Sequence, residues 1–380
     1  MMKTFTFKLA LTAIAASFLL SACGGGGGGD SAPSPAPAPA PAPAATPAAA
    51  PVPPAISLPS PPPIASIPAG FGPAVRAYTL ADLPTSTYLA GSPEKAMFDT
   101  LNKTRVGGGF GGIEQNAAID KAAKAHATYV LKNFVSINGV DSAASGVQIL
   151  PDGTIAIHAE VAGKVGFTGV RVKDRLAAQG YSSLFDNENV AFSIGKAPGE
   201  EPSVTSCLTD LVNSVFHRAT LLSSLYREIG FAVSDSVLDA NGYKTKACVI
   251  NFASNQLPPA FPSDFAGIYP VAGQTGLALS MSLERPDPAP EFSVKGYPLS
   301  FQGAFPTTLT VTKFELRDAN AALVATKLLT RAQTLSLSPN EAYLVPNGAL
   351  KQNAVYFATF TGISGVVPVS KSWSFTTGAN

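Results

Sequence analysis

A long stretch of proline and alanine near the N-terminus most limits what this chain can fold into. Residues 31–75 hold 16 of the 33 prolines and carry no charged side chain, and residues 24–29 before them are all glycine. Such a segment buries too little apolar surface to offset the entropy lost on ordering, and alternating proline favours extended polyproline II at about 3.1 Å per residue. We therefore expect residues 23–75 to form a disordered tether.

The segment before the tether predicts export. Lys3 and Lys8 precede an uncharged apolar run at residues 9–20, which is too short for a permanent span of the bilayer, because a spanning helix needs about 20 apolar residues. The run ends in Leu-Ser-Ala-Cys at Cys23. This ending resembles the lipobox of bacterial lipoproteins, which implies a signal peptide at residues 1–22 and a lipid, such as palmitate, on the Cys23 thiol. The alternative is an ordinary signal peptide with an incidental cysteine.

The lipobox resemblance also predicts a location and a partner. Glycine rather than aspartate follows the cysteine, and in a Gram-negative cell that favours the outer membrane. The protein is then held at the cell envelope, on the periplasmic or the external face, with the membrane as its partner through the lipid. The net charge of +1 argues against a surface that attracts polyanions, so nucleic acid is not an expected partner.

The chain after the tether is long enough for two ordinary domains. Residues 76–380 keep 24 basic and 24 acidic side chains, and 305 residues can bury two separate cores. Three cysteines in the whole chain exclude a fold built on disulfides. Three histidines leave a very short list of candidates for catalysis or metal binding.

Local signals in the first part of this chain predict helices followed by a β-hairpin. The expected helices start at Ser92-Pro93-Glu94, at Asn116, and at residues 170 and 205, ending at 107, near 130, at 179 and at 218. The expected hairpin joins residues 228–233 and 244–253 through Asn241-Gly242. The glycine-rich segment at 107–112 follows a helix and has no lysine and hydroxyl pair, so it is interpreted as a loop. This order indicates the α+β class.

Few side chains in this part suggest chemistry by themselves. His126 falls on or beside the apolar stripe of the second helix, where a core histidine with one or two hydrogen-bond partners is the simpler interpretation. No Gly-x-Ser-x-Gly segment is present, so the common serine-hydrolase signature is absent. Cys207 and Cys248 can be a nucleophile or a bridge, and in an oxidising compartment a disulfide is the simpler interpretation.

Six short segments occur in a characteristic order. They are residues 98–105 (FDTLNKTR), His158 with 166–169 (GFTG), 174–176 with 180–181 (DRL, GY), 187–191 (NENVA), 217–218 with 221–222 (HR, LL) and 226–231 (YREIGF). The pattern resembles the bacterial branch of the CAP superfamily, also called the SCP domain, over about residues 78–254. The expected domain covers residues 76–255. The resemblance implies an α-β-α sandwich with a large cleft.

The resemblance also implies a site. The family brings two histidines and two acids together at the floor of the cleft, and residue by residue these are His158, Glu188, His217 and Glu228. Two neutral imidazoles can bind zinc or another divalent metal, and the same four groups can do acid-base work without metal. The alternative gives Glu188 and Glu228 structural roles, holding backbone amides and a loop. Glu160 is a second acid two residues after His158, and on a strand the two would share a face.

The last part of the chain, residues 256–380, has a different sequence pattern. A proline-rich start leads to short apolar runs between glycine, proline and asparagine, which predict an all-β sandwich whose core contains Tyr356, Trp373 and Phe375. Residues 353–360 and 373–377 resemble the last strands of bacterial Ig-like domains. We expect packing, spacing or partner binding from this domain, and no chemistry.

These observations lead to three functional hypotheses. The first is a cell-surface binding module whose cleft takes a divalent metal and an envelope or extracellular ligand without turnover. The second is a metal-assisted or acid-base hydrolase of peptide or envelope polymer. The third is a structural protein in which the β-sandwich docks a partner and the cleft is idle. The fold alone does not choose among them.

Overall fold

The computed structural model describes residues 76–135, 156–238 and 241–379. The predicted signal peptide, the lipidated Cys23 and the tether at 23–75 lie outside these residues and stay predictions. The described residues belong to one compact unit. Within these ranges, no helix combines the length and the apolar character that crossing a membrane requires.

A five-stranded mixed sheet organises the first part of the chain. Its order is β1-β3-β5-β2, with β4 paired to β5. The strands are β1 (Glu114–Gln115), β2 (Phe185–Ile194), β3 (Glu228–Val233), β4 (Val237–Leu238) and β5 (Lys244–Ser254). Strands β3 and β5 pair antiparallel, so the two predicted strands are confirmed. The short strand β4 lies between them in the chain and also pairs with β5.

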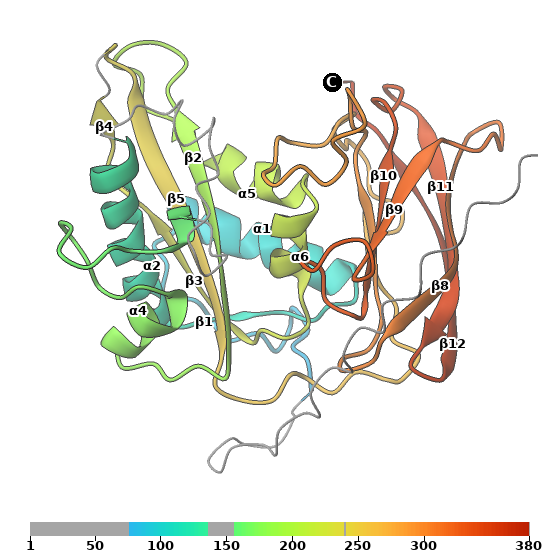
Figure 1. Ribbon diagram of the computed structural model, residues 1–380, viewed down its shortest axis with the longest axis horizontal. Coiled ribbons are helices and arrows are strands. Elements are labelled where there is room, and N and C mark those ends of the chain that lie inside the picture. Colours follow the sequence, from blue (N-terminus) through green and yellow to red (C-terminus); the bar gives the residue numbers. More distant parts are fainter. Residues whose placement is uncertain (1–75, 136–155, 239–240, 380) are drawn as a thin grey trace, which may run out of the picture. The chain divides into compact units, whose positions relative to one another are not determined.

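Helices lie on both faces of this sheet (Figure 1). Helices α2 and α4 lie on one side of it, and α1, α5 and α6 lie on the other. The helices are α1 (Pro93–Gly107), α2 (Ala117–Val130), α4 (Val172–Ala178), α5 (Thr205–Val212) and α6 (Phe216–Leu222), with a π-helical turn η1 (Leu131–Val135) and a 3-10 turn η2 (Ala156–His158). The α+β class is confirmed.

The first two helices begin at the residues that the sequence indicates. The Ser92 hydroxyl accepts a hydrogen bond from the backbone N–H of Lys95 at 3.1 Å, and Pro93 occupies the first turn of α1. The Asn116 side chain accepts from the backbone N–H of Ala118 at 2.9 Å at the start of α2. Each cap satisfies backbone donors that a helix start leaves unpaired, so these predictions are confirmed.

The single helix expected over residues 205–218 is wrong. The structure has two helices there, α5 and α6, separated at residues 213–215. The carboxylate of Glu284 accepts hydrogen bonds from the backbone N–H groups of Val215, Phe216 and His217 at 2.8 to 2.9 Å. A second helix start needs acceptors for its first N–H groups, and here a residue 67 to 69 positions away provides them.

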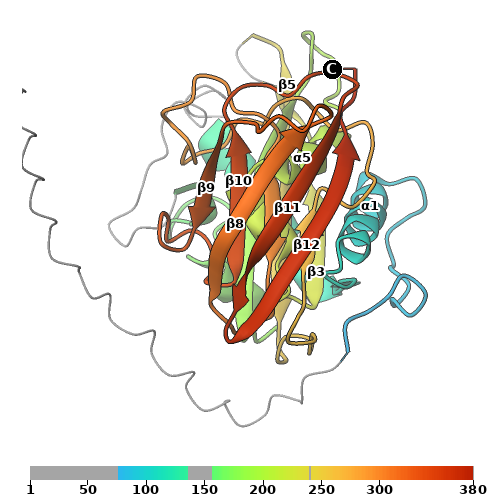
Figure 2. The same ribbon diagram turned by 90° about the vertical axis from the view of Figure 1, so that its right-hand side faces the viewer.

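Two antiparallel sheets form the last part of the chain. One sheet has the strand order β6-β7-β10-β9, and the other has the order β12-β11-β8. Strands β8, β11 and β12 of the second sheet lie side by side in Figure 2. The strands are β6 (Gly267–Tyr269), β7 (Leu299–Gln302), β8 (Leu309–Asp318), β9 (Thr326–Thr330), β10 (Glu341–Pro346), β11 (Val355–Ser364) and β12 (Val367–Thr376). Phe301 on β7 stacks on Phe360 on β11 with ring centroids 3.6 Å apart, so side chains of the two sheets meet in a common core.

The predicted core aromatics of this part are buried, with Tyr356, Trp373 and Phe375 each exposing 5% or less of their surface. Their cluster also contains side chains of α1, α5, β3 and β5. In addition, the buried Arg218 of α6 donates to the carbonyl oxygen of Pro298 at 2.6 Å and lies over the ring of Tyr269. The two parts of the chain therefore share one hydrophobic core.

A buried acid in this core makes stability depend on pH. Glu341 is 3% exposed and accepts hydrogen bonds from the Gln302 side chain and the backbone N–H of Ser338, both at 2.9 Å. Burial raises the pKa of Glu341 from 4.5 to about 7. Because the raised pKa belongs to the folded state, the neutral acid contributes its full stabilisation below pH 4.5 and loses it as pH rises through 7. The loss amounts to about 3 kcal/mol.

We therefore expect Glu341→Gln to remove most of the decline in the free energy of unfolding between pH 5 and pH 8. Denaturant unfolding at several pH values measures that slope. Glu291→Gln is the matched control, because the exposed Glu291 is paired with Lys327, whose hydrogen bond lowers the pKa of Glu291, and its titration falls below this window. An unchanged slope in Glu341→Gln would contradict the assignment.

Candidate functional site

A pocket of about 230 Å³ brings together side chains from distant parts of the sequence. His158 of η2, Glu188 of β2 and His217 of α6 line it, and Arg285 lines it from the C-terminal part. Three of the four predicted site residues are therefore neighbours around one pocket. Glu228 is not among the lining residues.

Each lining histidine contacts a buried carboxylate through Nδ1. His158 Nδ1 lies 3.0 Å from Glu188 Oε1, and His217 Nδ1 lies 2.7 Å from Glu284 Oε1. A carboxylate only accepts hydrogen bonds, so Nδ1 carries the proton in both rings and Nε2 keeps its lone pair in the neutral form. Both imidazoles can thus offer Nε2 as a metal ligand or a base.

Glu188 is the centre of a buried charge cluster. Its Oε2 accepts a hydrogen bond from Arg175 Nη2 at 2.8 Å, and its Oε1 lies 3.3 Å from His126 Nε2. Burial alone would raise the pKa of Glu188, but the charges of His126 and Arg175 and the hydrogen bond from His158 lower it to about 2. The carboxylate is therefore ionised at every physiological pH.

His126 is a core residue, as the sequence indicates, and it also supports the site. It is fully buried in α2, with Nδ1 2.9 Å from Glu160 Oε1 and Nε2 3.0 Å from the carbonyl oxygen of Ile157. Both ring nitrogens face oxygen acceptors, so the hydrogen bonds are satisfied together only when both carry protons. The charged ring then balances the negative charge of Glu188 and Glu160.

Glu160 and His158 do not share the face of a strand. His158 ends the 3-10 turn η2 and faces Glu188, while Glu160 faces His126 and accepts from the backbone N–H of Gly169 at 3.2 Å. The expectation of a common face required a β-strand, and this segment does not form one. Glu160 holds the loop after it and balances His126.

Glu228 does not line the pocket with the other three predicted residues. The prediction that all four groups meet in one cleft is therefore wrong for Glu228. Its carboxylate accepts hydrogen bonds from the Asn116 side chain at 2.7 Å and from the Tyr181 hydroxyl. Because Asn116 caps α2, Glu228 at the start of β3 orients that cap. The structural alternative expected Glu228 to hold the loop before β3, and its side-chain partners are Asn116 and Tyr181 instead.

Glu284 is a site residue that the sequence did not indicate. It lies in residues 256–380, where no chemistry was expected. It is 3% exposed, and although burial would raise its pKa, the hydrogen bond and charge of His217 and the backbone donors lower it. No local pattern around Glu284 marks it in the sequence, because its partners are 67 to 69 positions earlier.

The two lining histidines fit only part of a metal site. A metal-binding imidazole commonly donates its other ring N–H to a carboxylate, and His158 and His217 both do so. In the part of the chain that the structure describes, however, no group of three or more His, Cys, Asp or Glu side chains is placed to hold a metal. Two imidazoles supply two of the four ligands of a tetrahedral zinc site, so the other positions would need other ligands.

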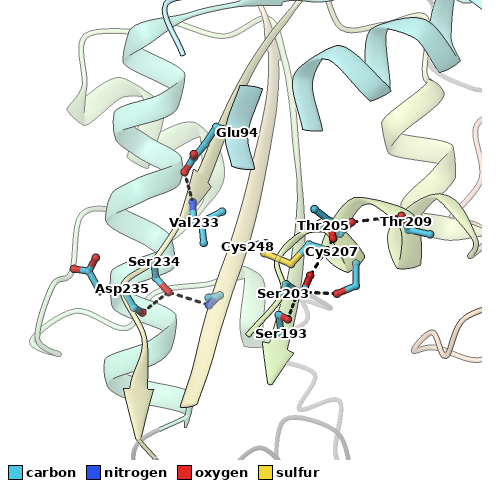
Figure 3. Close-up of a disulfide and its surroundings, with 12 residues drawn as sticks. Glu94, Ser193, Ser203, Thr205, Cys207, Thr209, Val233, Ser234, Asp235 and Cys248 are labelled. Atoms are coloured by element: carbon cyan, nitrogen blue, oxygen red, sulfur yellow. Dashed lines mark hydrogen bonds between the residues drawn. A yellow bond between two sulfur atoms is a disulfide. The ribbon is translucent and has the colours of Figure 1, made fainter. Parts of the chain in front are cut away.

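The structure has a disulfide between Cys207 and Cys248 (Figure 3). It links α5 to β5, and both cysteines are buried. A sulfur in this bond is not available as a thiolate nucleophile. Of the two interpretations of these cysteines, nucleophile or disulfide bridge, the structure has the disulfide bridge.

Comparisons with known proteins add little to this geometry. No family model matches the chain, and no curated protein matches it. Among solved structures, an outer surface protein from Borrelia burgdorferi is similar at 14% identity over 44% of this chain and 96% of that one, with a TM-score of 0.28. A likeness this low supports no conclusion about family or function.

Proposed function

We propose that the protein is an exported, lipid-anchored binding module of the cell envelope, with a CAP-like domain at residues 76–255 and an Ig-like β-sandwich at 256–380. In this proposal, the lipid on Cys23 holds the chain at the outer membrane, and the pocket between His158 and His217 binds a divalent metal together with an envelope or extracellular ligand, without turnover.

One observation carries the proposal. Both lining histidines have Nδ1 held by a buried carboxylate at 2.7 to 3.0 Å, and both border the same pocket. Fixing one nitrogen of each ring orients the other and raises its basicity. A bound metal supplies a Lewis acid, and His158 and His217 would hold it. Glu188 and Glu284 orient the two rings.

Zinc titration by calorimetry tests the metal site. We expect the full-length chain to bind zinc with a dissociation constant of about 1 μM or tighter, and His158→Ala and His217→Ala each to weaken binding at least about tenfold, because one ligand is lost. Lower pH should also weaken binding, since protons compete for Nε2.

The control is Asp264→Asn, which removes an exposed carboxylate that does not line the pocket. It should bind zinc as the parent chain does. If zinc binding is absent, or if both histidine variants bind as tightly as the parent, the metal site is refuted. Circular dichroism on each variant separates lost binding from lost folding.

The same histidine and carboxylate pairs favour a second candidate, an acid-base or metal-assisted hydrolase of peptide or envelope polymer. A neutral imidazole with an oriented Nε2 is a suitable general base, and the carboxylate at Nδ1 orients Nε2 in both pocket histidines. Turnover of a peptide or glycan substrate that is lost in His217→Ala would favour the hydrolase. Zinc binding without turnover supports the binding module.

A further inference from the structure

Both buried carboxylates beside the pocket have partners. Glu188 is balanced by Arg175 at 2.8 Å and by His126. Glu284 accepts hydrogen bonds from His217 Nδ1 and from three backbone N–H groups. Both carboxylates are buried and their oxygens already accept hydrogen bonds. A ligand in the pocket therefore meets little uncompensated negative charge.

Arg285 contributes a positive charge to the pocket. It is exposed and lines the pocket, directly after Glu284 in the sequence. The ion pairs among residues 76–135, 156–238 and 241–379 include none for Arg285, and the nearby acid Asp287 is already paired with Lys295 at 2.9 Å. A guanidinium presents two parallel N–H groups that match a carboxylate or a phosphate.

The remaining lining residues suit a small polar end group beside an apolar wall. The Ser336 hydroxyl and the Asn187 side chain are polar groups of the lining, and Phe216 and Pro286 form apolar parts of it. The pocket of about 230 Å³ is below the range of about 300 to 1,000 Å³ that drug-sized ligands occupy. It has room for one end of a larger molecule, or for a small molecule.

We infer that this pocket binds the anionic end group, a carboxylate or a phosphate, of its ligand, and that Arg285 is the residue that selects negative charge. The inference rests on the proposed binding function of the pocket and names the chemistry of its ligand. The loop that contains Glu284 and Arg285 then has two roles. One residue orients His217, and the next contacts the ligand.

Histidine ring signals in NMR spectra of the full-length, zinc-free chain test the inference, with acetate and inorganic phosphate as probes. The work is done at about 0.01 M ionic strength, where charge interactions extend about 30 Å. The signals of His158 and His217 are expected to shift and saturate with at least one anion, while those of the fully buried His126 stay nearly constant.

The choice of anion identifies the end group. Saturation by acetate alone identifies a carboxylate, and saturation by phosphate alone identifies a phosphate. Acetamide, the neutral analogue of acetate, is expected to cause no saturable shift.

Variants then separate the role of Arg285 from general surface charge. Arg285→Gln is expected to weaken anion binding at least tenfold, and Arg285→Lys to weaken it less, because the charge remains. Lys371→Gln removes an exposed cation on β12 outside the pocket and is expected to bind anions normally. Arg285 is exposed and makes no ion pair with the residues that the structure describes, so these variants should fold.

The inference is overturned if neither anion binds, if acetamide binds as well as acetate, or if Arg285→Gln binds like the parent chain. A zinc titration of Arg285→Gln keeps the two proposals apart. If Arg285→Gln still binds zinc but no longer binds the anion, the result supports both the metal site and the anion site. Anion binding in a chain that does not bind zinc refutes the metal site and leaves the anion site in place.

Discussion

Arg175→Met is expected to lower the free energy of unfolding by about 3 to 5 kcal/mol, because it leaves buried carboxylates without their main cation. Arg175 is fully buried in α4, where its guanidinium lies 2.8 Å from Glu188 and 4.0 Å from Glu160. It also donates to the carbonyl oxygen of His158 at 3.2 Å, so the loss extends to the backbone beside the pocket. Urea unfolding at pH 7 measures the effect.

Lys173→Met on the same helix is the matched control for Arg175→Met. Lys173 is exposed, so its replacement should change the free energy of unfolding by less than about 0.5 kcal/mol. The double variant Arg175→Met with Glu188→Gln should cost less than the sum of the two single changes, because it removes both charges of the pair. A loss below about 1 kcal/mol in Arg175→Met would show that His126 alone balances the carboxylates.

Replacing both Cys207 and Cys248 by alanine is expected to lower the free energy of unfolding by about 4 kcal/mol. The two cysteines are 41 positions apart, and opening a closed loop of that length restores about this much chain entropy to the unfolded state at 25 °C. Alanine is chosen because both sites are buried, where a serine hydroxyl would need a partner. Chemical denaturation of the oxidised parent and the double variant gives the difference.

Reduction provides the control for the disulfide prediction. A thiol reductant should destabilise the parent chain by a similar amount and leave the double alanine variant unchanged. Equal denaturation midpoints for the oxidised parent and the variant would show that the disulfide does not reduce the chain entropy of the unfolded state enough to change stability. Because α5 precedes the segment that carries His217, zinc titration of the variant also shows whether the link supports the site.

Much of the fold is predictable from short-range signals. Helix α1 follows from Ser92 and Pro93, and the cap of α2 follows from Asn116, because a cap needs only a side chain and the backbone two or three residues later. The apolar runs of residues 256–380 predict a β-sandwich, but they do not mark β6, β7 or β10. Strand β10 is buried along its length, so it lacks the alternation of apolar and polar residues that marks a half-exposed strand.

The candidate site also contains residues that the sequence predicts and residues that it does not. The motif resemblance identified His158, Glu188 and His217, and the structure has all three around one pocket. The same resemblance placed Glu228 with them, but Glu228 contacts the cap of α2. It did not indicate that Glu284, from the other part of the chain, holds His217.

By itself, the sequence determined the predicted export signal, the proline-rich segment, the α+β class and the residue types of the site, because these depend on composition, spacing and local hydrogen bonds. The tertiary structure alone decided the break between α5 and α6, the charge balance around Glu188 and the presence of Arg285 at the pocket. Each of these depends on groups far apart in sequence, and the free energy of a buried charge is set by the partners that folding brings within about 4 Å of it.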